Sequence, residues 1–275
     1  MRTTRALTAA AAVTALAVAL TACGSGSSDG GDDGTLVVGA TAVPAGEVLA
    51  YVKDNLAKKA GLDLEIKEFT DYVLPNTALQ EGSLGANLYQ HKPFLDDFNK
   101  SKNTDLVPVT EVYLPPMGLY SEKVGDIADL PDGATVAVPN DTTNEGRAFQ
   151  LLAAQGLIGL KKDAGPTAGP SDVAVNPKKL VFKELDPAQL PRSLGDVEAA
   201  VVNNNYALDA GLSPKKDSIL LESAEGNPYN NVLAVKKGDE DDPRVKKLSD
   251  LLTSPEVAAF IEKKYQGSVL PAGKN

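Results

Sequence analysis

The chain contains a single histidine, His91, and it lies where aromatic side chains gather. Residues 69–98 hold five of the 14 Phe and Tyr residues in a chain of 275, which has no Trp. Tyr72, Tyr89 and Phe94 lie near His91 in this segment, and we expect the four rings to surround an apolar group of a ligand. A thioether makes favourable contacts with aromatic faces, worth roughly 0.3–1.5 kcal/mol each. The alternative is ordinary core packing, with His91 as a satisfied polar residue.

A second group of residues is suited to binding an anion. In the segment "VAVPNDTTNEGRAFQLL" a predicted strand ends at Pro139 and a predicted helix begins at Thr142, where Thr142 and Glu145 fit a capping box. Arg147 follows in the second turn. Free N–H groups at a helix start and a guanidinium can both point at a carboxylate. The alternative is a solvated surface arginine.

Two turns are rich in asparagine, and each adjoins a predicted strand. The first contains Asn203, Asn204 and Asn205, and the second contains Asn227, Asn230 and Asn231. Side-chain amides both donate and accept hydrogen bonds, so they can bind the carboxylate and the ammonium of an amino acid together. Asparagine also favours turns without any ligand, and that alternative stays open.

The composition argues against several other classes of protein. The formal net charge is −10, from 27 Lys and Arg against 37 Asp and Glu, so a nucleic-acid surface is not expected. One histidine cannot supply HExxH or a histidine-rich metal site, and the single cysteine allows no intramolecular disulfide. Nucleotide-binding and nucleophile-elbow motifs are missing. A serine–histidine dyad built on His91 remains as an alternative, that of an exported hydrolase.

The N-terminus has the pattern of an export signal. Arg2 and Arg5 precede an apolar run over Leu7–Leu20, which is too short to span a bilayer comfortably, and small residues follow. The tetrapeptide "LTAC" ending at Cys23 resembles a bacterial lipobox, in which the cysteine is lipidated and becomes the first residue of the mature protein. The alternative is an ordinary signal peptide with an incidental cysteine.

The N-terminal region therefore divides into two predicted parts before the globular body. Residues 1–22 are predicted to be a lipoprotein signal peptide, and residues 23–34 a lipidated cysteine with a flexible tether. The tether sequence "GSGSSDGGDDG" has no apolar residues to pack. We expect the body to be held at the extracytoplasmic face of the cell membrane.

The body alternates predicted strands with predicted helices, twice over. The expected strands cover 35–41, 62–69, 85–89, 106–114, 134–140, 180–185, 197–203 and 230–235, and the expected helices cover 47–60, 75–80, a segment from 91, 142–155, 188–194, 205–210, 243–253 and 255–265. This alternation predicts an α/β fold with largely parallel sheets and helices on both faces. Because the carboxyl ends of parallel strands meet at a ligand crevice, the candidate residues are expected to converge there.

Two rounds of α/β alternation predict two lobes with a cleft between them. Segments Tyr113–Ser121 and Glu222–Val232 combine Pro and Gly with extended residues, as hinge crossovers do. The predicted lobe 1 covers 35–115 plus 232–275, and the predicted lobe 2 covers 116–231.

Several separate segments resemble one family in its order. They are "FTDYVLPNTAL", "NLYQHKPFL", "GLYSEKV", "VAVPNDTTNEGRAFQLL", "LPRSLGDVEAAVVNNNYA" and "NPYNNVLAV". The chain from Thr35 to about Ala272 resembles the methionine-binding lipoproteins of bacterial ABC importers, the NlpA family. The resemblance implies a hinged fold like that of type II periplasmic binding proteins. It also implies a monomer without catalysis or cofactor, which delivers methionine to a membrane permease whose partner subunits hydrolyse ATP.

The resemblance also implies roles for individual residues. Around the methionine side chain it places Tyr72, Tyr89, His91 and Phe94, and at the amino-acid head group it places Arg147 on the α-carboxylate with Asn144, Asn203 and Asn231 as hydrogen-bonding partners. Tyr89 and Phe94 stand where many relatives carry Phe and Tyr, and Ala45 replaces a frequent histidine. Another small apolar amino acid or a methionine-containing dipeptide is therefore an alternative ligand, and a surface interaction lipoprotein is a more distant reading.

Overall fold

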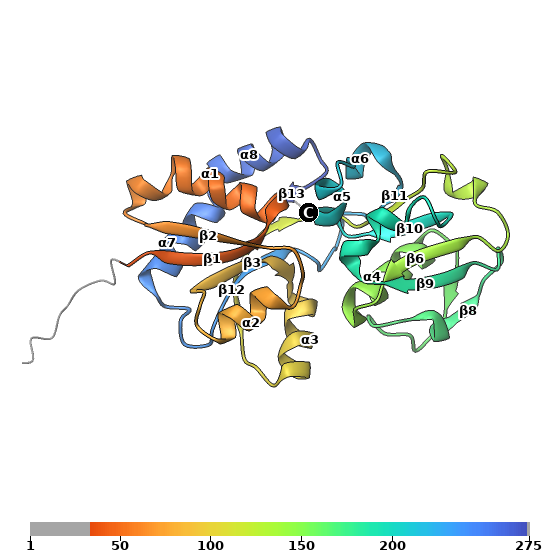
Figure 1. The fold of residues 1–275 in the computed structure, drawn as a ribbon, viewed down its shortest axis with the longest axis horizontal. Helices are drawn as coiled ribbons and strands as arrows, with labels where there is room; N and C mark the ends of the chain where they lie inside the picture. The colour runs from red at the N-terminus through yellow and green to blue at the C-terminus, as the bar shows by residue number, and fades with distance from the viewer. Residues whose placement is uncertain (1–33, 274–275) are drawn as a thin grey trace, which may run out of the picture. The chain divides into compact units, whose positions relative to one another are not determined.

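The strands form two main sheets, and helices cover both faces of each (Figure 1). The structure is a computed structural model that describes residues 34–273. The predicted signal peptide, Cys23 and the tether up to Asp33 lie outside the described residues. Within residues 34–273, no helix is long and apolar enough to cross a membrane.

The first sheet is mixed rather than purely parallel. Its strands, in spatial order, are β13 (Leu270–Pro271), β4 (Val107–Leu114), β12 (Asn231–Val235), β3 (Ala86–His91), β1 (Leu36–Thr41) and β2 (Leu64–Phe69). Strand β1 is parallel to β2 and β3, whereas β12 is antiparallel to both β3 and β4. Strand β12 runs the other way because it enters this sheet from the second one, after a long excursion of the chain.

The second sheet has the same character. Its order is β11 (Ser218–Leu221), β5 (Gly118–Tyr120), β10 (Ala199–Val202), β6 (Thr135–Pro139) and β9 (Val181–Leu185). Strands β6, β9 and β10 are parallel, while β5 is antiparallel to β10 and β11. A separate pair, β7 (Gly159–Leu160) with β8 (Val173–Val175), lies outside this sheet. Strands β5, β7, β8 and β11 were not predicted, because segments of two to four residues rarely show a readable periodicity.

The helices agree with the expected segments, with changes at some ends, except that the one-turn helix α6, at Pro214–Asp217, was not predicted. They are α1 (Glu47–Asn55), α2 (Leu74–Gln80), α3 (Lys92–Lys102), α4 (Thr142–Ala154), α5 (Asn204–Asp209), α6 (Pro214–Asp217), α7 (Pro243–Leu252) and α8 (Pro255–Tyr265). The expected helix over 47–60 changes to a 3₁₀ turn at Ala57–Ala60 before Gly61 ends it in the left-handed region. The helical piece expected over 188–194 is two 3₁₀ turns, Pro187–Gln189 and Pro191–Ser193.

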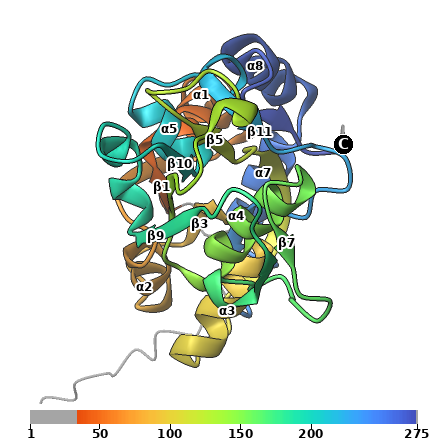
Figure 2. The ribbon, with the colours of Figure 1, turned by 90° about the vertical axis from the view of Figure 1, so that its right-hand side faces the viewer.

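The C-terminal segment packs with the first sheet, far from its neighbours in sequence. One apolar core joins Val48 of α1 and Leu88 of β3 to Leu233 of β12 and Ile261 of α8. In Figure 1, α1 and α8 lie on one side of the first sheet, and α2 and α3 lie on the other. A separate core beneath the second sheet includes Val136 of β6 and Phe149 of α4. In Figure 2 the molecule is turned so that the second sheet, with α4 and β9, faces the viewer.

The chain passes between the two sheets at two connections. Residues 115–117 join β4 to β5, and residues 222–230 join β11 to β12. Both connections fall inside the segments expected to be crossovers. They lie beside the carboxyl ends of strands that carry most of the candidate ligand residues.

Helix α4 can approach its neighbouring loop only because residue 146 is a glycine. A Cβ atom built on Gly146 would lie 2.0 Å from the backbone oxygen of Pro166 and 2.7 Å from the Cα atom of Thr167. Neither atom belongs to a flexible side chain, so the loop and the helix would have to separate. The position matters for the site, because α4 also carries Asn144 and Arg147.

We predict that Gly146→Ala lowers the free energy of unfolding by about 1–3 kcal/mol, the range for overpacking a close contact. Urea denaturation measures it. Gly165→Ala, in the same loop, is the matched control, because nothing lies within 4 Å of a Cβ atom there. Equal denaturation midpoints for the two variants would contradict the close-approach argument.

Candidate functional site

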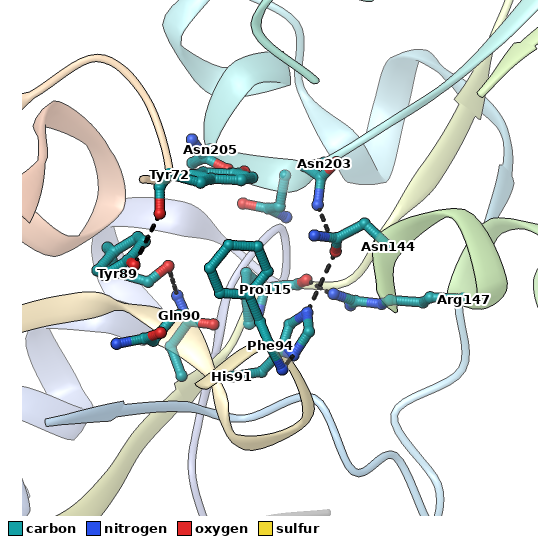
Figure 3. A pocket seen from close by; sticks show the side chains of 12 residues that line it. Tyr72, Tyr89, Gln90, His91, Phe94, Pro115, Asn144, Arg147, Asn203 and Asn205 are labelled. Carbon is teal, nitrogen blue, oxygen red and sulfur yellow. Dashed lines mark hydrogen bonds between the residues drawn. The ribbon is translucent and has the colours of Figure 1, made fainter. Parts of the chain in front are cut away.

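The eight predicted ligand residues line one pocket between the two sheets (Figure 3). The pocket encloses about 370 Å³, part of it open to solvent, and is lined by Tyr72, Tyr89, Gln90, His91, Phe94, Pro115, Asn144, Arg147, Asn203, Asn204, Asn205 and Asn231. Gln90, Pro115, Asn204 and Asn205 were not among the predicted ligand residues.

Strand ends bring these side chains together. On the first-sheet side, Tyr72 follows β2, Tyr89 and His91 end β3, and Asn231 begins β12. On the second-sheet side, Asn144 and Arg147 lie in the first turns of α4 after β6, and the three asparagines from 203 follow β10. The pocket therefore has walls from both halves of the fold, as expected for the carboxyl ends of α/β strands.

The aromatic side chains form one wall of the pocket. The ring centroid of Tyr72 lies 6.0 Å from that of Tyr89 and 5.8 Å from that of Phe94, and the Tyr89 and Phe94 centroids are 6.2 Å apart. Both phenol hydroxyls already have partners. The Tyr72 hydroxyl donates to Asn205 Oδ1, and the Tyr89 hydroxyl donates to the Tyr72 carbonyl at 2.9 Å. This wall consequently offers a ligand ring surfaces rather than free hydroxyls.

His91 connects the aromatic wall to the polar wall. Its Nδ1 accepts the backbone N–H of Phe94 at 3.2 Å, which caps α3, and its Nε2 lies 3.1 Å from Asn144 Oδ1. The amide nitrogen of Asn144 donates to Asp141, which leaves Oδ1 facing His91. Nε2 of the histidine must then carry the proton. The ring is thus neutral, and both of its nitrogens have partners. His91 is therefore a satisfied polar residue, as the alternative of ordinary core packing described it, but it also lines the pocket.

The start of α4 differs from the sequence prediction. Asp141 is the N-cap, since its carboxylate accepts the backbone N–H of Asn144 at 3.0 Å, and Thr142 is the first helical residue. The predicted capping box between Thr142 and Glu145 was therefore wrong. An aspartate caps at least as well as a threonine, and it lay one position earlier in the sequence.

Two buried amide oxygens in the polar wall have no hydrogen-bond partner among the described residues. Asn203 donates its Nδ2 to Asn144 Oδ1 at 2.8 Å, and Asn204 donates its Nδ2 to the carbonyls of Pro116 and Ser268. The Oδ1 atoms of Asn203 and Asn204 remain unsatisfied. A buried polar atom without a partner costs about 1–3 kcal/mol, so N–H donors from a ligand would stabilise this wall.

Arg147 is buried and held on three sides. Its side chain is 2% exposed. Its Nε and Nη2 donate to the carboxylate of Glu222 at 2.9 and 2.5 Å, and Nη2 also donates to the Pro115 carbonyl at 3.0 Å. The ring of Tyr229 stacks on the guanidinium, 4.3 Å from its carbon atom. The alternative of a solvated surface arginine was therefore wrong, and Glu222 was not predicted.

One nitrogen of that guanidinium is left for a ligand. The hydrogen bonds that Arg147 makes to described residues all come from Nε and Nη2, and none comes from Nη1. Figure 3 shows Arg147 on one side of the pocket and the rings of Tyr72 and Tyr89 on the other, with the ring of Phe94 between them.

Burial sets the protonation of the charged and titratable groups in the site. Burial, helped by the Arg147 guanidinium, lowers the pKa of His91 to about 3. Burial also raises the pKa of Asp141. For Glu222, burial alone would raise the pKa, but the charge and hydrogen bonds of Arg147 hold that pKa below its usual value. Across residues 34–273, no three potential metal-ligating side chains cluster.

Gln90 shows a part of the site that the sequence analysis missed. Its Nε2 donates to Asn76 Oδ1 at 2.7 Å and to Asn87 Oδ1 at 3.0 Å, and Asn76 donates back to Gln90 Oε1 at 2.8 Å. Asn76 belongs to α2 and Asn87 to β3. These interlocked amides fix the end of β3, and with it the positions of Tyr89 and His91.

Several known proteins are similar to this chain in both sequence and fold. The NlpA lipoprotein family profile matches residues 36–273. The D-methionine-binding lipoprotein MetQ of Escherichia coli (strain K12) is 42% identical over 265 residues, which cover 94% of this chain and 96% of that protein. A nutrient-binding protein from Burkholderia cenocepacia, solved bound to methionine, superposes with a TM-score of 0.84 at 48% identity, covering 86% of this chain and 100% of that one. An ABC transporter periplasmic substrate-binding protein from Coxiella burnetii gives 0.83 at 42% identity, with coverage of 86% and 100%.

The neutral state of His91 predicts a specific acid sensitivity. Its pKa of about 3 lies below the ordinary value of 6.5, so the folded state excludes a proton that the unfolded state takes up. The stability that this contributes is complete above pH 6.5 and is lost as the pH falls toward 3. The loss should approach 1.4 kcal/mol per pH unit, the value of about one proton.

We therefore predict that the unfolding free energy of the wild type falls more steeply between pH 6.5 and 4 than that of His91→Asn, which keeps a capping acceptor. Urea denaturation at several pH values measures the two slopes. Other acidic groups titrate in both proteins, so their contribution cancels in the comparison. Parallel curves would show that His91 is not held neutral.

Proposed function

The chain belongs to the NlpA lipoprotein family, and from this membership we propose that it is the substrate-binding lipoprotein of an ABC importer for methionine. It binds its substrate without changing it and delivers it to a membrane permease, while ATP hydrolysis belongs to partner subunits. The match covers nearly all of the described residues, and the related Burkholderia cenocepacia protein carries methionine.

The polar wall supports an amino-acid head group, and it is the observation that carries the proposal. Arg147 Nη1 is the donor available to the α-carboxylate. The unsatisfied Oδ1 atoms of Asn203 and Asn204 are acceptors for the ammonium group. An ammonium has three N–H donors, enough to satisfy both oxygens at once. Asn144 and Asn231 complete this end of the pocket.

The aromatic wall supports the thioether. Tyr72, Tyr89 and Phe94 present ring surfaces whose polar atoms are already bonded, and His91 is neutral at physiological pH. Sulfur interacts favourably with aromatic rings, and a charged side chain would be desolvated there without a partner. This wall therefore favours an apolar, polarisable side chain.

Contacts across the pocket support closure of two lobes over the ligand. Tyr72 bonds to Asn205, the Tyr206 hydroxyl donates to the Thr70 carbonyl at 3.0 Å, and His91 bonds to Asn144. Each pair joins the 35–115 side to the 116–231 side. We propose that these ranges, with 232–275 added to the first, move as lobes about residues 115–117 and 222–230, and that the closed form docks on the permease.

Ligand binding is tested on the full chain purified in detergent, after unfolding and refolding to remove any co-purified ligand. Thermal unfolding is followed with each amino acid and with methionyl dipeptides. A ligand at about 100 times its Kd adds roughly 2.7 kcal/mol to the folded state. We expect the largest shift with methionine. A larger shift with a dipeptide or another amino acid would reassign the ligand, and no shift at all would reject a receptor role.

Arg147→Ala should weaken methionine binding by about 2–5 kcal/mol, because it removes one partner of a buried charge pair. Calorimetric titration measures the change. Arg192→Ala is the control, since Arg192 is an exposed arginine of the 116–231 range that lies outside the pocket. Equal affinities in the two variants would remove the carboxylate role of Arg147.

The proposed anchor is the lipid on Cys23, which holds the protein at the extracytoplasmic face of the membrane. Acyl chains contribute about 0.8 kcal/mol per buried CH₂ group, and two or more chains give stable attachment. Cys23→Ser should therefore move the protein from the membrane fraction to the soluble fraction, as judged by fractionation and immunoblotting. Ser28→Ala, in the same tether, should leave it in the membrane fraction. Membrane retention of the Cys23→Ser protein would contradict the anchor.

A further inference from the structure

The Glu222 carboxylate occupies an edge of Arg147 that a ligand carboxylate would otherwise use. Its two oxygens accept from Nε and Nη2 in a bidentate pair, and the Glu222 side chain is only 11% exposed. Oε2 accepts a further hydrogen bond from the backbone N–H of Met117 at 3.1 Å. A bidentate guanidinium–carboxylate pair is among the strongest polar contacts in proteins, so this edge is not readily given up.

The Arg147–Glu222 pair also determines which nitrogen of Arg147 a ligand can bind. Pro115 takes a second hydrogen of Nη2, and Tyr229 covers one face of the guanidinium. Within residues 34–273 this leaves Nη1 as the free donor. A ligand carboxylate is then held through one nitrogen, and the direction of that nitrogen is set by Glu222 from the opposite edge. Glu222 is thus a positioning residue for Arg147.

The two oppositely charged side chains that pair at this end of the pocket, Arg147 and Glu222, balance each other before any ligand arrives. Arg147 contributes one positive charge and Glu222 one negative charge, and His91 is neutral. Asp141 is the other carboxylate bonded to a described pocket side chain, and it faces the amide nitrogen of Asn144. The Asn144 side chain therefore stands between Asp141 and the cavity. A ligand with no net charge preserves this balance, while an anion or a cation leaves a buried charge without compensation.

We propose that Glu222 sets the charge selectivity of the pocket, restricting its ligands to zwitterions of zero net charge. Without the glutamate, Arg147 would be a lone buried cation, and a simple carboxylate would satisfy it. With the glutamate, the ligand carboxylate needs the ligand's own ammonium, bound at Asn203 and Asn204, to offset it. The inference rests on the proposed function and names the class of substrate within it.

Three ligands of nearly equal size separate the charge states. Methionine is the zwitterion, 4-(methylthio)butanoate lacks the ammonium and is an anion, and methioninol lacks the carboxylate and is a cation. Calorimetric titration of each into the full chain in detergent gives the Kd values for the wild type, Glu222→Gln and Glu222→Asp. The control is Glu198→Gln, because Glu198 also pairs with a cation, Lys123, and accepts a backbone N–H, that of Thr135, away from the pocket.

In Glu222→Gln we expect the affinity for the anion, relative to methionine, to rise on the order of tenfold, and that for the cation to fall by a similar factor, because one charge a few ångströms away has been removed. Glu222→Asp keeps the charge and should restore the wild-type ratios, even if its affinities are lower. Glu198→Gln should leave the ratios unchanged. Unchanged ratios in Glu222→Gln, or equal changes in the Glu198→Gln control, would overturn the proposal.

The wild type provides a second test if Glu222→Gln does not fold. A balanced pocket should bind both the anion and the cation more weakly than methionine, with the two within about tenfold of each other. A strong preference for the anion over methionine would mean that Arg147 acts as an uncompensated cation, and it would overturn the proposal while leaving a receptor function intact. Failure of methionine itself to bind would instead reject the proposed function.

Discussion

A buried guanidinium must be compensated, and the arrangement around Arg147 follows from that requirement. Glu222 supplies the opposite charge from the 222–230 connection, while Pro115 and Met117 bring the backbone of the 115–117 connection to the same pair. Removing either partner of such a pair commonly costs 3–5 kcal/mol, because it leaves a buried charge alone. The same contacts that keep Arg147 folded therefore hold the two connections side by side and aim one nitrogen into the pocket.

The rest of the polar wall extends this constraint by a chain of directed hydrogen bonds. Asp141 caps α4 and takes the Asn144 amide nitrogen, so the Asn144 oxygen faces His91 and Asn203. Each step sets the orientation of the next side chain. The chain of hydrogen bonds ends at the Asn203 Oδ1 atom, which has no partner among the described residues, and such unsatisfied buried atoms are rare in folded proteins. The polar wall thus presents amide acceptors beside the Arg147 guanidinium, which is the arrangement that the proposed amino-acid head group requires.

Some of the pocket residues could be predicted from the sequence, and others could not. The convergence of Tyr72, Tyr89 and His91 was predictable because they lie at or just after the ends of strands whose apolar pattern is clear, and strand ends converge in α/β folds. Arg147 was found from the start of its helix. Glu222 was not, because it is 75 residues from Arg147 and only the tertiary fold brings them together. Asn204 was noted in an asparagine-rich turn but was not chosen as a ligand residue, because asparagine also favours turns without any ligand. The short strands β5 and β11 carried no pattern. Local signals predict elements, whereas pairings between segments that are distant in the sequence require the packed structure.

The most direct measurement is a crystal structure of the protein with methionine bound. The account predicts the thioether sulfur against the rings of Tyr72, Tyr89 and Phe94, the α-carboxylate on Arg147 Nη1, and the ammonium within hydrogen-bond distance of the Asn203 and Asn204 oxygens. It also predicts that the Arg147–Glu222 pair stays intact beside the ligand. A ligand bound in the reverse direction, with its head group among the rings, would contradict the account. So would a guanidinium that leaves Glu222 for the ligand.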